Sequence, residues 1–248
     1  MKIAVISDIH EDIVNLKVAL KKIEKFKADE IICLGDISGF SIPYYHHLNS
    51  RNAHECISLI KSTCKTVVLG NHDMHAAKIL PKHCNFFKYP DNWYELNYQQ
   101  KKEIAKNIIW LHEENDLDPL YTENDLQYLK TLPEYFIYKT PKINILFTHY
   151  AYPNISGLKK EFFTYTDEFF NHFNFMDINN CTISFIGHTH IQGLLMVSRK
   201  KINSLRFGEV NLKSKPSCLG IPSIALNKKK NGFCIFDIDK MVVNTIKI

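Results

Sequence analysis

The chain has 248 residues, of which 45% are hydrophobic and 23% are charged, and it contains only 9 Gly and 9 Pro. This composition is typical of a globular α/β domain with enough apolar material for one large core. The net charge of +5 comes mainly from lysines spread along the chain, without the compact basic block or aromatic-basic motif typical of nucleic-acid-binding proteins.

The chain shows no signal for export or membrane insertion. The apolar run at residues 3–6 is shorter than the roughly 7–15 residues of a signal peptide core, and no stretch approaches the roughly 20 apolar residues of a membrane span. The seven cysteines are scattered and form no CxxC motif. We therefore expect free, mostly buried thiols and a cytoplasmic protein without a membrane partner.

The first seventy residues alternate between strand-like and helix-like patterns. Continuous apolar runs predict buried strands at 2–7, 30–34 and 66–69, and helical spacing of apolar residues predicts helices at 12–27 and 52–63. Such β-α-β-α-β alternation implies a parallel sheet with right-handed crossovers.

The middle of the chain breaks this alternation. Residues 80–98 are aromatic and irregular, and helices are predicted over 99–114 and from 122 to about 132. We interpret the region 80–135 as a helical insertion or side layer of a single domain spanning residues 1–248, with a small separate cap as the alternative.

Strand patterns return in the second half. Buried strands are predicted at 135–139, 143–148 and 182–186, with a helix near 165–173. Residues 193–248 contain short strand-like runs separated by turn signals, which predicts antiparallel pairing.

Polar side chains follow five of the predicted strands at the point where each strand ends. In chain order they are Asp8 and His10, Asp36, Asn71 and His72, His149, and His188 and His190. Ligands bind at the carboxyl ends of strands in open parallel sheets, so five such ends on one sheet would converge. In extended chain, residues at i and i+2 project to the same side, so each of the two i, i+2 pairs can reach one ion.

The donor set favours two metal ions. A single histidine at a strand end is more often a surface or core residue, and only the joint pattern argues for a site. Without His72, the set offers two carboxylates, one amide oxygen and four imidazoles, too many nitrogen donors for one ion. Two divalent or trivalent ions sharing a carboxylate would use them all, and mixed oxygen and nitrogen ligation favours Mn, Fe or Zn over Ca or Mg. Such a pair can clamp a phosphate and activate water.

These motifs resemble those of a known family. The segments Asp8-Ile9-His10, Gly35-Asp36, Gly70-Asn71-His72-Asp73, His149 and Gly187-His188-Thr189-His190 are similar to the ordered motifs of the calcineurin-like metallophosphoesterases, in particular the small prokaryotic phosphodiesterase-like branch. The resemblance implies a four-layer αββα sandwich, an α/β (α+β) fold whose first half is parallel or mixed and whose second half is antiparallel.

The resemblance also implies roles for individual residues. Asp8, His10 and His190 would hold the first metal ion, and Asp36 would bridge both ions. Asn71, His149 and His188 would complete the second. A hydroxide between the metals would be the nucleophile, and His72 would act as general acid or donate to a phosphate oxygen. Asp73 is a candidate supporting residue beside His72.

One departure from the family concerns the residues after Gly35-Asp36. The protein Ser/Thr phosphatases carry an Asp and an Arg there, whereas this chain has Ile37-Ser38-Gly39-Phe40-Ser41. This argues against a phosphatase of that type and leaves the residue that orients His72 open.

We therefore expect a metal-dependent phosphoric ester hydrolase, either phosphodiesterase or phosphatase, acting on a small phosphorylated substrate such as a nucleotide. Aromatic residues in the loops 39–50, 74–98 and 150–164 offer surfaces for stacking on a base, although they can equally pack the loops onto the body. The alternatives are a non-catalytic scaffold and a nuclease. The retained motifs argue against the first, and the lack of a long basic groove argues against polymeric nucleic acid. The oligomeric state stays open.

Overall fold

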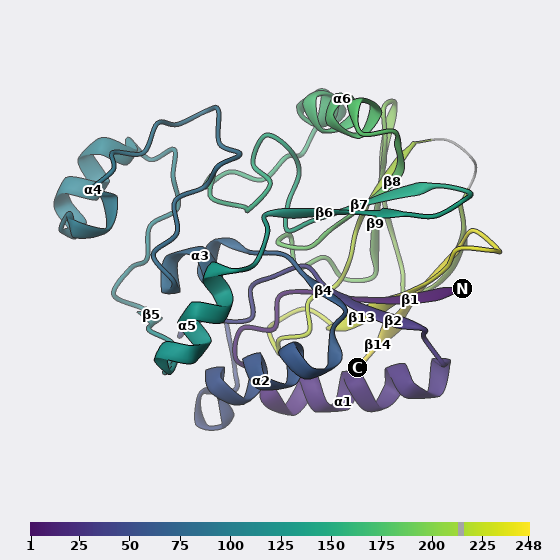
Figure 1. Ribbon diagram of the computed structural model, residues 1–248, viewed down its shortest axis with the longest axis horizontal. Helices are drawn as coiled ribbons and strands as arrows, with labels where there is room; N and C mark the ends of the chain where they lie inside the picture. Colours follow the sequence, from purple (N-terminus) through teal and green to yellow (C-terminus); the bar gives the residue numbers. More distant parts are fainter. Residues whose placement is uncertain (213–215) are drawn as a thin grey trace.

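Two six-stranded mixed sheets form the centre of the computed structural model, which describes residues 1–212 and 216–248 (Figure 1). The first sheet has the order β11-β14-β13-β1-β2-β4. Its strands are β1 (Lys2–Ile6), β2 (Glu30–Cys33), β4 (Thr66–Val67), β11 (Gly208–Asn211), β13 (Gly232–Asp237) and β14 (Val242–Lys247).

The second sheet has the order β10-β9-β12-β8-β7-β6. Its strands are β6 (Tyr135–Lys139), β7 (Asn144–Thr148), β8 (Cys181–Ile186), β9 (Leu194–Ser198), β10 (Lys201–Leu205) and β12 (Ser217–Gly220). A separate two-stranded ribbon pairs β3 (Phe40–Ser41) with β5 (Asp116–Leu117).

Six α-helices and three short 3-10 helices accompany the sheets in the part of the chain that the structure describes. The α-helices are α1 (Ile13–Phe26), α2 (Ala53–Thr63), α3 (Asn71–Ala76), α4 (Tyr98–Ala105), α5 (Glu123–Lys130) and α6 (Phe170–Ile178) within the described residues. The 3-10 helices there are η1 (Leu48–Ser50), η2 (Trp93–Glu95) and η3 (Thr166–Phe169). None of the described helices is both long and apolar enough to cross a membrane.

The period-2 alternation of β1 explains how the layers form. Ile3 and Val5 face the second sheet and join the core between the two sheets, whereas Ala4 and Ile6 face α1 and α2. On the far side of the second sheet, Leu146 and its neighbours pack against α6. The layers therefore run α1/α2, sheet, sheet, α6, which is the expected αββα sandwich (Figure 1).

Parallel strands form one half of the first sheet and the centre of the second, and the other strands pair antiparallel. The predicted parallel start is confirmed by β1, β2 and β4. In residues 193–248 the predicted antiparallel pairing holds for β9, β10, β11, β13 and β14. Strand β12 differs, because it lies between β8 and β9 and runs parallel to β8.

The predicted helix at 99–114 is wrong in its second half. Helix α4 ends at Ala105, and Lys106 and Asn107 both take left-handed backbone conformations. The chain then runs extended, with the Trp110 N–H donating to Leu158 O at 2.8 Å and the Lys160 N–H donating to Ile108 O at 2.9 Å. The apolar residues that suggested a helical face instead pack and pair in an extended segment.

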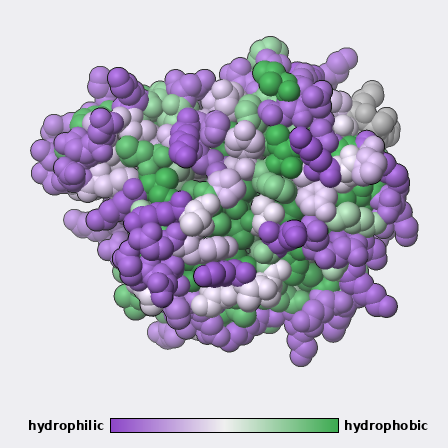
Figure 2. Space-filling model, in the orientation of Figure 1, coloured by the Kyte–Doolittle hydropathy of each residue, from purple (hydrophilic) through white to green (hydrophobic). Residues whose placement is uncertain are grey.

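The region around α4 has its own small apolar cluster, built on Trp93, Ala105 and Ile109. Figure 1 shows α4 at one end of the molecule, away from both sheets. The outside of this lobe is largely hydrophilic in Figure 2, as the sequence of α4 requires. All seven cysteines are free thiols, as expected, and most of them are buried.

Candidate metal centre

The candidate ligands gather where strands of both sheets end. Asp8 and His10 follow β1, and Asp36 and Asn71 follow β2 and β4 of the same sheet. The other three, His149, His188 and His190, follow β7 and β8 of the second sheet. The expectation that all five ends belong to one sheet is therefore wrong. They meet because the parallel strands of both sheets finish at the same edge of the sandwich.

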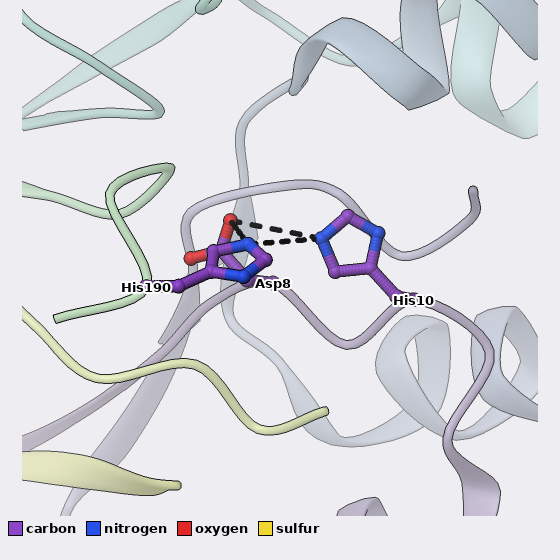
Figure 3. Close-up of side chains that lie close together, drawn as sticks. All are labelled: Asp8, His10 and His190. Carbon is purple, nitrogen blue, oxygen red and sulfur yellow. Dashed lines mark hydrogen bonds and ion pairs between the residues drawn. The ribbon is translucent and has the colours of Figure 1, made fainter. Parts of the chain in front are cut away.

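Asp8, His10 and His190 form the first group of ligand atoms (Figure 3). His190 Nε2 lies 3.3 Å from Asp8 Oδ1 and 3.2 Å from His10 Nε2. Ligands at about 2.0–2.1 Å from a tetrahedral ion are separated by about 3.3 Å, so these atoms have the spacing that one ion requires.

Asp36, His149 and His188 form the second group. His149 Nε2 lies 3.2 Å from Asp36 Oδ2 and 3.2 Å from His188 Nδ1. Asp36 Oδ2 is also only 3.7 Å from His10 Nε2, which belongs to the first group. The Asp36 carboxylate therefore lies between the groups, where a bridging ligand has to be.

Backbone carbonyls set the orientation of two of the imidazoles. His10 Nδ1 donates to Gly39 O at 2.7 Å, and His149 Nδ1 donates to Leu34 O at 2.8 Å. Because a carbonyl only accepts, these bonds place a proton on Nδ1 and direct Nε2 at the site.

Asn71 supplies an independent sign that a ligand belongs here. Its Oδ1 is buried and has no hydrogen-bond partner among the described residues. Leaving a buried acceptor unpaired costs about 1–3 kcal/mol, whereas an amide oxygen is a good metal ligand. The donor set of carboxylate, amide and imidazole groups thus fits divalent metal ions.

The backbone at the ligands is unusual. Asp8, His10, Asp36, His188 and His190 all have positive φ angles between 45° and 61°. The prediction that the i, i+2 pairs project together from extended chain is therefore wrong, because these residues lie in left-handed turns beyond the strands. Moreover, His188 and His190 belong to different groups. Strain of this kind is concentrated at functional sites.

Charge and burial prepare the groups for metal binding. Burial favours the neutral acid, yet the neighbouring imidazoles hold the pKa of Asp8 and the pKa of Asp36 below the usual carboxylate range. Burial lowers the pKa of His10 to about 4 and the pKa of His188 to about 3, so both are neutral near pH 7. His149 is different, because Asp36 overcomes burial and raises its pKa to about 9. A metal ion must displace that proton.

His72 lies in the first turn of α3, next to both groups. Its N–H donates to Asp36 Oδ1 at 3.0 Å, and its ring packs 4.4 Å from the Trp110 ring. A Cβ at Gly39 would approach the His72 ring to 2.2 Å. The ring makes no hydrogen bond with the described residues, so packing between Gly39 and Trp110 holds it in place.

Asp73 serves the loop after β2 instead of the His72 ring. Its carboxylate accepts hydrogen bonds from the N–H groups of Ile37, Ser38 and Gly70 and from the Ser38 hydroxyl, at 2.9–3.2 Å. Burial raises its pKa to about 7. Asp73 therefore ties the segment after Asp36 to the segment that carries Asn71 and His72.

A pocket of about 590 Å³ opens above the ligands. Its wall includes Tyr44, Tyr45, Trp110 and Phe162, and lysines of two loops, Lys159, Lys160, Lys228 and Lys229. Trp110 and the lysines at 228–229 were not predicted to line a site. Trp110 falls within the helix that the sequence predicts over 99–114, on the side with its apolar residues, and neighbouring lysines on a surface loop carry no specific signal.

Comparison with known proteins identifies the family of the chain. The family described as calcineurin-like phosphoesterase matches residues 1–192. The chain belongs to this metallophosphoesterase family.

Relatives cover the whole chain. An uncharacterized protein of Methanocaldococcus jannaschii, MJ0912, is 27% identical over 99% of this chain and 86% of its own length. A metallophosphoesterase from Sphaerobacter thermophilus superposes with a TM-score of 0.67 at 19% identity, covering 100% of this chain and 88% of that one. The hypothetical protein PH1004 of Pyrococcus horikoshii OT3 gives a TM-score of 0.60 at 16% identity, covering 100% of this chain and 87% of that one. These structures establish a shared fold.

Proposed function

We propose that the chain is a metal-dependent phosphoric ester hydrolase that cleaves phosphodiester or phosphomonoester bonds in small substrates, nucleotides included. The observation that carries this proposal is the position of Asp36, whose carboxylate adjoins both ligand groups and accepts a hydrogen bond from His72. Two metal ions held by these groups would supply Lewis-acid activation of the phosphoryl group and of the attacking water.

The residues divide into two ligand sets. Asp8, His10 and His190 would hold one ion, and Asn71, His149 and His188 would hold the other, with Asp36 common to both. Mn, Fe and Zn suit this mixture of oxygen and nitrogen donors best.

His72 would act on the substrate. Burial lowers the pKa of its ring in the free protein, although Asp36 opposes this effect, so the ring is neutral near pH 7. A neutral ring can donate one N–H to a phosphate oxygen. The negative charge of a bound phosphate would raise its pKa toward the value that suits a general acid for the leaving group.

The pocket suits small substrates. Its aromatic wall offers faces for a nucleobase or another flat leaving group, and its lysines attract anions. We propose that the insertion at 80–135, which contributes Trp110 to this wall, serves substrate selection within a single domain. A pocket of this size argues for small phosphorylated partners over polymeric nucleic acid.

The test is turnover by the purified protein after reloading with Mn²⁺. It should be assayed on bis(p-nitrophenyl) phosphate, on p-nitrophenyl phosphate and on a panel of nucleotides, with metal content measured in the same samples. Hydrolysis of at least one class is expected. Fully metallated protein that turns over none of them would contradict the proposal and favour a non-catalytic scaffold.

A further inference from the structure

A second histidine cluster lies outside the ligand sets described above. It combines His75, Asp118 and His112, each of which offers one ligand atom, and these atoms all lie within 4.8 Å of one another. His75 lies one turn after His72 on α3, whereas His112 and Asp118 belong to the segment that follows Trp110. The cluster therefore joins the helix of His72 to the wall of the pocket.

One distance within this cluster already suits a metal ion. His112 Nε2 lies 3.3 Å from Asp118 Oδ1, the separation expected of two ligands on one tetrahedral ion. The rings of His75 and His112 are stacked, with centroids 4.4 Å apart and an interplanar angle of 7°. Because the rings are parallel, one of them must turn about its Cβ–Cγ bond to direct its lone pair at a shared ion.

These side chains also lack other partners. None of the three makes a side-chain hydrogen bond with the described residues, and His112 Nδ1 is buried without a partner. In this respect they differ from His172, which is bonded through both ring nitrogens, to Tyr152 and to Ser184. A histidine pair that only packs needs no carboxylate, yet Asp118 lies against this one.

We propose that His75, His112 and Asp118 form a third metal site, distinct from the proposed catalytic pair, which takes a Zn²⁺-like divalent ion with water completing the coordination. Two imidazoles, one carboxylate and an open position are a ligand set that zinc uses in proteins.

The charged groups that act on His75 make Asp118 necessary to the site. Asp118 is acidic and favours a cation there, whereas Lys78 and Lys101 are positive and oppose it. The Asp118 carboxylate is therefore needed to offset the lysines as well as to ligate the ion.

An ion at this site would tie α3 to the pocket wall. Trp110 packs edge-on against His75 at 5.9 Å and lies 4.4 Å from His72. Binding of the ion would steady Trp110 against His72 without contacting the substrate. The proposal does not depend on the proposed hydrolase activity, because its test measures bound metal.

The experiment compares Zn²⁺ bound per chain in the full-length protein and in three variants. Each is stripped with chelator, dialysed against buffered Zn²⁺, and analysed by inductively coupled plasma mass spectrometry. His112→Gln is expected to bind one ion fewer than the parent. Asp118→Asn should lower the affinity for that ion by about tenfold or more. Even groups that only hold a ligand in place contribute about 10–100-fold to metal affinity.

His54→Gln is the matched control. His54 also pairs with a carboxylate, Asp125 at 2.8 Å, but has no second histidine beside it, so this variant should keep every ion of the parent. Equal zinc content in the parent and in His112→Gln would overturn the proposal, whatever the other sites hold. Asp118 is exposed and its replacement should leave folding intact, so unchanged zinc affinity in Asp118→Asn would overturn it as well.

Discussion

The loops that carry the candidate ligands and the insertion at 80–135 both contribute to the wall of one pocket, but they are built differently. The candidate ligands Asp8, His10, Asp36 and His149 are at most 1% exposed, and each follows a parallel strand of a sheet. The insertion contributes Trp110 to the pocket wall, and Trp110 is half-buried in irregular chain between α4 and α5. The candidate ligands are therefore fixed by the sheets, whereas the insertion can change without disturbing them.

Breaking the ligand side should have the largest effect. Asp36→Asn removes the charge that adjoins both ligand groups, so metal content should fall and turnover should drop by at least about 10³-fold, or about 4 kcal/mol in transition-state energy. The measurements are kcat/KM and metal content after reloading. Asp167→Asn, at an exposed position in η3, is the control and should change neither.

His72 lies between the candidate ligands and the insertion, next to Asp36 and Trp110. His72→Ala should keep both proposed catalytic ions but lose about 10²–10⁴-fold in kcat, because it removes the proton donor and no ligand. Steady-state kinetics and metal analysis on the same preparation check this. If kcat stays at the parent value, His72 is neither acid nor donor.

Replacing Trp110 tests the part of the pocket wall that the insertion at 80–135 contributes. Trp110→Ala should leave metal content unchanged and lower kcat/KM by about tenfold, because the His72 ring loses the packing that holds it. Trp110→Phe should recover much of the loss, since a smaller ring can fill part of the space. A Trp110→Ala variant with parent kinetics would show that Gly39 and the backbone position His72 without it.

The smallest effect is expected at His172, a buried histidine outside the candidate metal centre. Burial lowers the pKa of His172 to about 3, well below the ordinary value of about 6.5. Stability from keeping it neutral is therefore fully present above about pH 6.5 and is lost as the pH falls toward 3. His172→Gln should make the dependence of unfolding free energy on pH shallower in this window, by up to about 1.4 kcal/mol per pH unit.

Urea unfolding of metal-free protein between pH 4 and 7 measures this slope. The control is His46→Gln at an exposed position, which should leave the slope of the parent unchanged. Identical slopes in the parent and in His172→Gln would mean that His172 is not held neutral by the fold.

Sequence patterns predicted the parts of the molecule in which local signals agree with tertiary structure. Helix α1 begins after Asp12, whose side chain caps it, and α5 begins after Thr122 in the same way, both as apolar spacing and capping preferences indicate. The candidate ligands stand out in the sequence because polar side chains directly after buried strands are poor core packing, and the structure brings these side chains together.

Other features depend on contacts between distant segments. The division of the ligands between two sheets follows from how the sheets pack, which no local pattern encodes. The segment after Ala105 has helical spacing, but it pairs with residues near Leu158, so a tertiary contact overrides the local preference. The position of Trp110 beside His72 follows from the same pairing.

The left-handed backbone at five of the ligands has a consequence for how relatives should be compared. A non-glycine residue in that conformation costs about 1–3 kcal/mol, and glycine avoids most of this cost. Replacing Asp8 or His190 with glycine should therefore relieve strain in the metal-free chain while destroying its ligand set. A lineage can thus lose its chemistry and keep, or even strengthen, the same sandwich. A shared sandwich fold is therefore not by itself evidence of activity, which depends on whether each candidate ligand is present.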